Sequence, residues 1–322
     1  MNSLCRALLA IGVALAAAGA SAQTYPSKPI RVIVPFPPGG GTDIIARDVS
    51  QKVAALTGWT LVVDNRPGAG GNLGVEAVAK SPPDGYTLVL GQTSNMAINA
   101  TLYPKLPYDP QKDLAPIVLV AQAPLVLVTA AGSPFKTLDD VVKAAKSKPG
   151  AINFASPGNG TVAHLTSELF QKAAAIKLQH IPYKGAAQAL TDVISGSVEL
   201  YMSSVPTLLA QIRQGKLRAL AVTSAKRVDD LPDVPTIQEL GYPGFDASTW
   251  FGFLAPAGTP NEIVAKLNAE FNRALQQPDL RKKLADQGAE PIGGTPAQFA
   301  ALIRNDIVRW GKVVKESGAR ID

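Results

Sequence analysis

Three glycine-rich segments of the sequence are candidates for binding an anion. They span 36–43, 65–72 and 156–161, and each joins a predicted strand to a predicted helix. Glycine lets a ligand approach the backbone closely, and the first amides of a helix have no partner within it. Because these amides lie at the positive end of the helix dipole, they favour a carboxylate or another small anion. Glycine in such a turn can also serve backbone geometry alone, so each segment taken singly leaves both interpretations open.

These loops do not match the common nucleotide-binding motifs. Gly41 is followed by Thr42 and Asp43, so the lysine of a P-loop is missing. Leu73 stands where the third glycine of the dinucleotide fingerprint belongs, and no acidic residue lies about 20 positions further on. The loops suit a carboxylate instead, with an affinity of roughly micromolar, or about 8 kcal/mol.

The sequence offers little that could carry out catalysis. Its only histidines, His164 and His180, do not have the spacing of a metal site, and the Gly-x-Ser-x-Gly elbow of serine hydrolases is absent. His164 falls in the first turn of a predicted helix, where it either donates to a ligand oxygen or stays neutral and bonds to local backbone. His180 falls within a predicted strand, and we expect it to be structural.

We therefore predict a protein that is not an enzyme and needs no cofactor and no metal. The alternative is an exported hydrolase or lyase with His164 as its base.

Strands and helices alternate along the chain, which indicates an α/β fold with largely parallel sheets. Two apolar stretches, 117–129 and 250–254, are expected to cross between two lobes. The other predicted strands are 30–35, 61–64, 86–90, 152–155, 179–183 and 217–223, and the predicted helices are 43–56, 73–80, 138–147, 161–175, 186–195, 206–214, 260–275 and 296–316.

The length of 322 residues suits two domains of ordinary size, and 46% hydrophobic residues are enough for folded cores. Because the pattern of strands and helices restarts after the first crossing stretch, we predict a discontinuous first lobe, 23–124 and 248–322. The second lobe is predicted to span 125–247.

The first 22 residues have the features of a secretory signal peptide. Arg6 provides the positive start, 7–18 is uncharged and apolar, and Ala20-Ser21-Ala22 is a small-residue cleavage site. Cys5, the sole cysteine, lies inside this peptide, so the exported chain is predicted to lack thiol chemistry and disulfides. No later segment is long and apolar enough to span a membrane. We predict a periplasmic protein.

The basic residues do not form a nucleic-acid surface. The net charge is +6, but the 31 Lys and Arg residues are scattered and aromatic residues make up only 6% of the chain. We expect no nucleic-acid partner, and a mildly positive protein fits a small anionic ligand.

A series of motifs resembles the Bug family, the extracytoplasmic solute receptors of tripartite tricarboxylate transporters. The resemblance covers essentially the whole mature chain in the right order. Its motifs are YPSKPIRVIVPF from Tyr25, NRPGAGG from Asn65, DGYTL from Asp84, LPYDP from Leu106, HL at His164, PYKG from Pro182, GKLRALAVT from Gly215, PDVPT from Pro232 and APAGTP from Ala255.

The resemblance implies a type II periplasmic-binding protein fold, in which two α/β lobes joined by crossing strands close around a carboxylated ligand. It also implies delivery to membrane permease subunits, with a sensor kinase as the alternative partner, and we expect a monomer.

Ser203 stands where relatives often carry Asp, which favours a plain carboxylate over an amino acid. Which carboxylate binds is not readable from the sequence. The implied ligand-binding residues, several of them also chosen above from the glycine loops, are Phe36, Gly39, Gly40, Gly41, Thr42, Asp43, Gly70, Gly71, Thr93, Ser94, Asn95, Ser156, Gly160, Thr161, His164 and Ser203.

Overall fold

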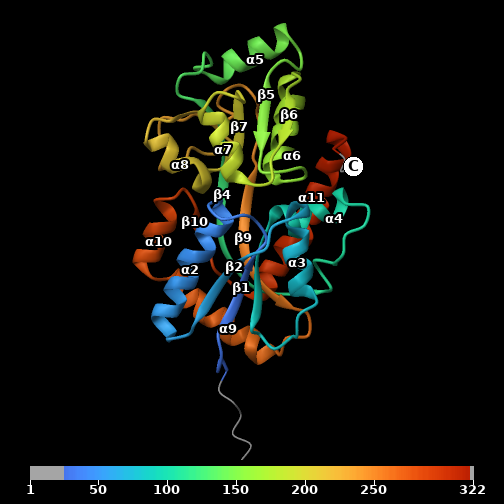
Figure 1. The fold of residues 1–322 in the computed structure, drawn as a ribbon, viewed down its shortest axis with the longest axis vertical. Helices are drawn as coiled ribbons and strands as arrows, with labels where there is room; N and C mark the ends of the chain where they lie inside the picture. The colour runs from blue at the N-terminus through green and yellow to red at the C-terminus, as the bar shows by residue number, and fades with distance from the viewer. Residues whose placement is uncertain (1–24, 320–322) are drawn as a thin grey trace, which may run out of the picture.

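The computed structural model describes residues 25–319, so the predicted signal peptide 1–22 lies outside the described residues. Two α/β lobes lie one above the other along the longest axis of the molecule (Figure 1). The predicted α/β fold of two lobes is therefore confirmed.

The sheet of the lower lobe has mixed strand directions. Its order is β2 (Leu61–Asn65), β1 (Ile30–Val34), β3 (Thr87–Gln92), β9 (Ser248–Pro256) and β4 (Leu114–Ala130), with the short β10 (Glu290–Pro291) also on β4. β1 pairs in parallel with β2 and β3, whereas β9 runs antiparallel to β3 and β4. The carboxyl ends of β1, β2 and β3 therefore lie at one edge of this sheet, which faces the upper lobe (Figure 1).

The sheet of the upper lobe continues from the same β4. β7 (Leu200–Ser204) and β8 (Leu217–Val222) both run antiparallel to β4, and β5 (Asn153–Ser156) lies in parallel between β7 and β6 (Gln179–Pro182). Within β4, the residues up to Pro124 pair with β9, and those from Leu125 onward pair with β7 and β8. β4 thus passes from one sheet into the other, and the start of β9 lies beside it at this point.

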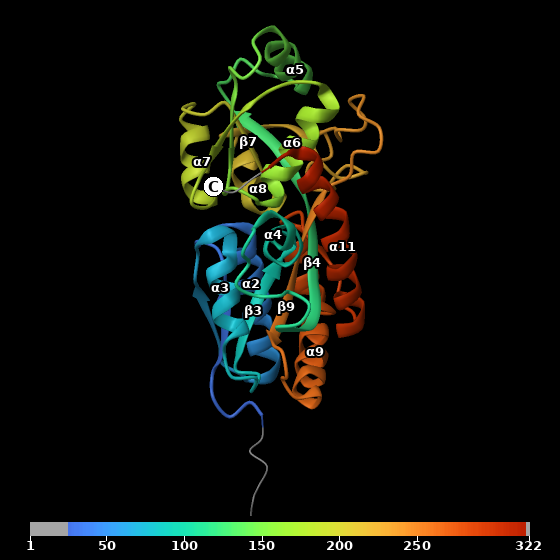
Figure 2. The same cartoon turned by 90° about the vertical axis from the view of Figure 1, so that its right-hand side faces the viewer.

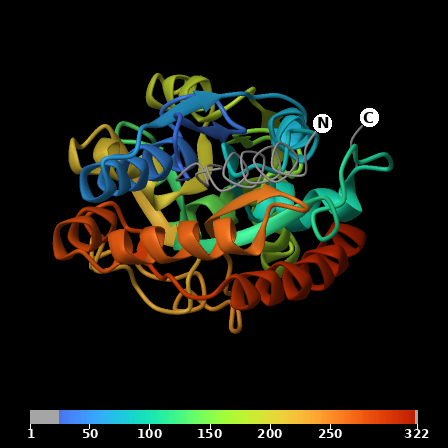
Figure 3. The same ribbon diagram turned by 90° about the horizontal axis from the view of Figure 1, so that it is seen from below.

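Helices cover both faces of the lower sheet (Figure 3) because alternate side chains of a strand point to opposite faces. Val32 packs with α2 and α9, whereas Ile33 packs with α3 and α11. The helices are α2 (Gly41–Thr57), α3 (Asn72–Ala79), α4 (Asn99–Leu102), α5 (Leu138–Ser147), α6 (Val162–Ala174), α7 (Ala186–Ile194), α8 (Val205–Arg213), α9 (Asn261–Leu275), α10 (Pro278–Ala285) and α11 (Pro296–Ser317), with single turns η1 (Ala69–Gly71) and η2 (Ser94–Ile98).

The C-terminal helix α11 contacts both lobes (Figure 2). Near its start, Phe299 packs edge-on against Trp250 of β9. Near its end, Trp310 and Val314 join the hydrophobic core that contains Phe170 of α6. The helix predicted for 296–316 therefore packs against two hydrophobic cores in succession.

The predicted strands and helices are found at their expected positions, with ends that differ by a few residues. The sequence prediction missed β7, β10, α4, α10 and the turns η1 and η2. β7 is a five-residue strand buried almost throughout, so it lacks the polar alternation that marks a half-buried strand. α10 buries only Leu280 and Leu284, which is too short an apolar pattern to stand out.

Candidate functional site

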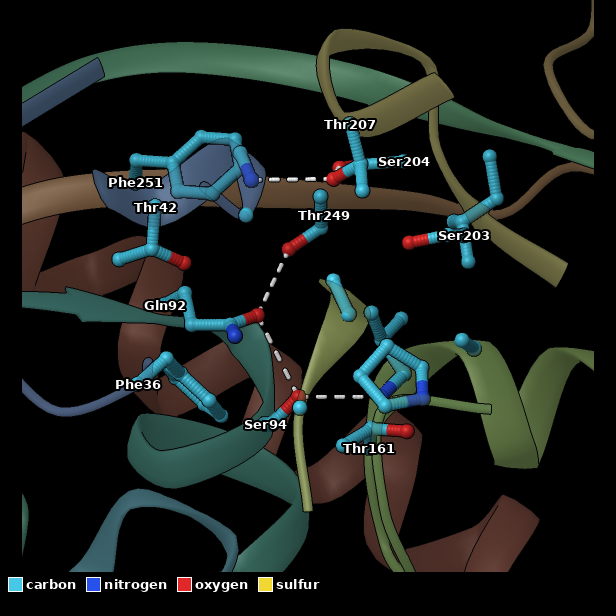
Figure 4. Close-up of a pocket in the computed structure, with 18 of the residues that line it drawn as sticks. Phe36, Thr42, Gln92, Ser94, Thr161, Ser203, Ser204, Thr207, Thr249 and Phe251 are labelled. Carbon is cyan, nitrogen blue, oxygen red and sulfur yellow. Dashed lines mark hydrogen bonds between the residues drawn. The ribbon is translucent and has the colours of Figure 1, made fainter. Parts of the chain in front are cut away.

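A cavity of about 50 Å³ lies between the two lobes, next to the crossing strands β4 and β9 (Figure 4). We call it the inner cavity. The start of α2 and the end of β3 line it from the lower lobe, and the starts of α6, α7 and α8 line it from the upper lobe. The residues that line it are Phe36, Pro37, Gly40, Gly41, Thr42, Gln92, Ser94, Leu125, Pro157, Thr161, Val162, Ala163, Gly185, Ala186, Ser203, Ser204, Thr207, Thr249 and Phe251.

In the lower lobe, the loop 36–43 presents the start of α2 to the inner cavity. Asp43 does not line the cavity. Its carboxylate accepts hydrogen bonds from the Gly39 amide (3.0 Å), Arg47 Nε (3.0 Å) and Asn65 Nδ2 (2.9 Å). Burial opposes ionisation of Asp43, but these hydrogen bonds and the charge of Arg47 outweigh it and lower the pKa of the carboxyl. Asp43 therefore shapes the loop, while Gly40, Gly41 and Thr42 face the cavity.

In the upper lobe, the loop 156–161 presents the start of α6. Thr161 is the N-cap residue, and its hydroxyl accepts from the His164 amide (3.4 Å) and donates to the Gly158 carbonyl (2.8 Å). Gly160 has a φ of 72°, a left-handed conformation that suits glycine. Thr161 lines the inner cavity.

Two hydrogen bonds join the helix starts to hydroxyl groups of the opposite lobe (Figure 4). The Gly41 amide donates to Thr207 Oγ1 (3.0 Å), and the Val162 amide donates to Ser94 Oγ (3.0 Å). A Cβ atom at Gly41 would lie only 2.7 Å from Ser204 Oγ, so the lobes meet too closely there for a side chain. The structure is thus a closed arrangement, in which the starts of α2 and α6 each donate a hydrogen bond to the other lobe.

Gln92 lies at the centre of a hydrogen-bond network in the inner cavity (Figure 4). Its Oε1 accepts from Thr249 Oγ1 (3.0 Å) and from Ser94 Oγ (3.3 Å). These bonds orient the side-chain amide so that Nε2 is left to donate to a ligand. Thr93, by contrast, uses its hydroxyl to accept from the Trp250 amide (3.0 Å) of the crossing strand β9.

A second cavity, of about 580 Å³, opens between the lobes beside the inner cavity. We call it the outer cavity. It shares Phe36, Pro37, Pro157 and Gly185 with the inner cavity, so these residues form the wall between the two. The turn containing Gly70 and Gly71 lines only the outer cavity.

The structure places the predicted site residues in three groups. Those that line the inner cavity are Phe36, Gly40, Gly41, Thr42, Ser94, Thr161 and Ser203. Those that line the outer cavity, besides Phe36, are Gly70 and Gly71. Those that line neither cavity are Gly39, Asp43, Thr93, Asn95, Ser156, Gly160 and His164.

Sequence reasoning omitted several residues that line the inner cavity. Gln92 lies just beyond the predicted strand 86–90 and is not among the predicted site residues. Ser204 is the last residue of β7, the missed strand, and Thr207 lies in the first turn of α8, so the strand-to-helix junction that carries them went unrecognised. Thr249 lies in β9, where no local pattern marks it.

The site lacks ionised side chains. All side chains that line the inner cavity in the described part of the chain are apolar or uncharged. Behind the loop 156–161, burial lowers the pKa of His164 to about 4, and burial together with the neighbouring His164 lowers the pKa of His180 to about 3. A bound charge in the inner cavity would therefore be balanced by amides, hydroxyls and helix dipoles.

Within residues 25–319, no helix is both long and apolar enough to cross a bilayer. Across the same residues, no group of three or more His, Cys, Asp and Glu side chains is arranged to hold a metal ion.

Comparison with known proteins identifies the family. The model of the tripartite tricarboxylate transporter family receptor matches residues 45–319. The chain belongs to this receptor family. Protein BugT of Bordetella pertussis is 43% identical over 324 residues, with 99% of each chain covered, so the resemblance to Bug receptors is confirmed.

Solved structures of family receptors have the same two-lobe periplasmic-binding protein fold. An R. palustris protein solved with adipate is 36% identical with a TM-score of 0.90, covering 92% of this chain and 100% of that chain. MatC from Rhodopseudomonas palustris, solved with bound malate, is 35% identical with a TM-score of 0.85, and the match covers 90% of this chain and 100% of that chain. The family and its structural neighbours are solute-binding proteins, and the family's members are periplasmic receptors.

Proposed function

We propose that the chain is a periplasmic receptor that captures a small carboxylate between its lobes and delivers it to the permease of a tripartite tricarboxylate transporter. The observation that carries this proposal is that the starts of α2 and α6 face one cavity from opposite lobes. Helix starts attract anions, and a ligand held by both favours the closed state over the open one. Membership of the receptor family supports the partnership with a permease.

The inner cavity favours a plain carboxylate over an amino acid. A buried ammonium group is best compensated by a carboxylate, and none of the described residues that line this cavity carries one. Ser203, which lines it, supplies a hydroxyl at the position where an acid would hold an amino group. Relatives solved with adipate and malate support a carboxylate ligand.

The ligand is proposed to contact the predicted residues that line the inner cavity, together with Gln92 and Thr249. Those lining neither cavity, such as Asp43 and His164, are proposed to support the loops. The first lobe is proposed to span 23–124 and 248–322, and the second lobe 125–247. The two lobes are proposed to rotate about the crossing strands β4 and β9. The chain is proposed to be exported by its N-terminal 22 residues, to act as a monomer and to perform no catalysis.

The test is ligand binding by the purified mature protein. Thermal melting across a panel of mono- and dicarboxylates should reveal at least one acid that stabilises the protein, by about 2.7 kcal/mol when its concentration is 100 times the dissociation constant. The uncharged amide of that acid is the matched control and should give no shift. NMR after prolonged incubation should recover the acid unchanged. Absence of binding across the panel would contradict the receptor, and turnover would favour an enzyme.

A further inference from the structure

Two histidines stack behind the loop 156–161, outside both cavities. The rings of His164, in the first turn of α6, and His180, in β6, have centroids 3.9 Å apart and planes only 9° from parallel. The ring of Phe154 stacks on His180 at 4.7 Å. These are the only histidines of the chain, and the binding site described above uses neither directly.

Each histidine is hydrogen-bonded to one end of the loop. His180 Nε2 lies 2.7 Å from Ser156 Oγ. Ser156 Oγ also lies 3.0 Å from the Gly158 carbonyl and accepts from the Gly158 amide (3.2 Å). The direction of the hydrogen bond between Ser156 and His180 is set by the imidazole tautomer. At the other end, the Gly160 amide donates to His164 Nδ1 (3.2 Å). The loop is therefore tied to the stacked pair on both sides of its apex.

This attachment bears directly on the binding surface. Pro157 lies within the tied segment and Thr161 directly follows it, and both line the inner cavity, while Gly158 and Asn159 line the outer cavity. Because Ser156 is fully buried, a bond lost there is not replaced by solvent without the loop moving. The bond between His180 and Ser156 thus helps to hold the loop in place relative to the lower lobe.

His180 is not a major packing residue of the core. It is partly exposed and lies on β6, the last strand of its sheet. Replacing its ring by a similar ring should therefore change the stability of the protein little. The bond to Ser156 is the feature that distinguishes it from an ordinary edge-strand side chain.

We propose that His180 is a positioning residue for ligand binding, which acts through its hydrogen bond with Ser156 and so holds the loop 156–161 in its ligand-binding shape. This inference rests on the proposed function, because it concerns the same cavity. It assigns a role in binding to a residue that the sequence analysis interpreted as structural.

Two substitutions separate the hydrogen bond from the ring. His180→Phe keeps an aromatic ring against Phe154 but cannot form a hydrogen bond with Ser156. His180→Gln gives up the ring and places a side-chain amide within reach of the position of Nε2, so it restores a hydrogen-bonding group. Affinity is measured by calorimetry with the carboxylate that stabilises the wild type most. We expect about tenfold weaker binding for His180→Phe, as is typical for loss of one buried hydrogen bond, and binding within about threefold of wild type for His180→Gln.

A double-mutant cycle with Ser156→Ala tests the route of the effect. If His180 acts through Ser156, the variant with His180→Phe and Ser156→Ala should bind no more weakly than Ser156→Ala alone. Additive losses would overturn the proposal, and so would wild-type affinity in His180→Phe or an equal loss in His180→Phe and His180→Gln. If His180→Phe does not fold, His180→Leu takes its place in the cycle. A wild-type protein that binds no carboxylate would refute the proposed function itself and this inference with it.

Discussion

The hydrogen bond between Ser94 and the start of α6 should contribute measurably to closure of the receptor. In the closed structure the Val162 amide donates to Ser94 Oγ across the cleft at 3.0 Å, and Ser94 is fully buried. In an open form the same amide can bind water, so Ser94→Ala penalises only the closed state. An unsatisfied buried donor costs about 1–3 kcal/mol, which corresponds to an affinity loss of about 5- to 150-fold. Gln92 keeps its bond from Thr249, so the rest of the network survives the substitution.

Calorimetry with the best carboxylate of the panel measures this loss, and small-angle scattering of the empty protein should show a larger radius of gyration for Ser94→Ala. Ser167→Ala is the matched control, because Ser167 is also buried but donates to the Ala163 carbonyl (2.9 Å) within α6. The control should bind within about twofold of wild type. If Ser94→Ala binds no more weakly than Ser167→Ala, the contact does not contribute to closure and the reasoning fails.

Two other predictions follow from the loop 36–43. Gly41→Ala should weaken ligand binding by about tenfold or more with little change in the melting temperature of the empty protein. The reason is that its Cβ would meet Ser204 Oγ at 2.7 Å only when the lobes are closed. Gly132→Ala, where a Cβ would meet nothing within 4 Å, is the control, and equal affinities of the two variants would contradict the closed geometry. Asp43→Asn should destabilise the protein by about 1.5–3 kcal/mol at pH 7 in urea unfolding. Since the folded-state pKa of Asp43 is lowered, its contribution is present above the unfolded value of about 4 and is lost as the pH falls through the folded value. The two proteins should therefore become equally stable at a pH below the folded value, and a constant difference would argue against the ionised carboxylate as the cause.

Local sequence patterns were sufficient where one segment provides the whole feature. The junction at Thr161 combines a strand, a glycine loop and an N-cap, and the structure has a helix starting there. Ser203 was singled out on resemblance, and it does line the inner cavity. The same reasoning grouped Asp43 with the cavity-lining residues, although its carboxylate turns back onto its own loop and Arg47. Backbone pattern predicts where a helix begins, but not which way a side chain beside it points.

The sequence alone determined the alternation of strands and helices, the stretches that cross between lobes and the glycine loops that start α2 and α6, because each depends on residues close together in the chain. The tertiary structure alone decided which groups meet across the cleft. Gly41 and Thr207 are 166 positions apart, and Thr249 and Gln92 are 157 apart. Such contacts depend on how two separately formed lobes come together about β4 and β9, and no local propensity encodes that arrangement.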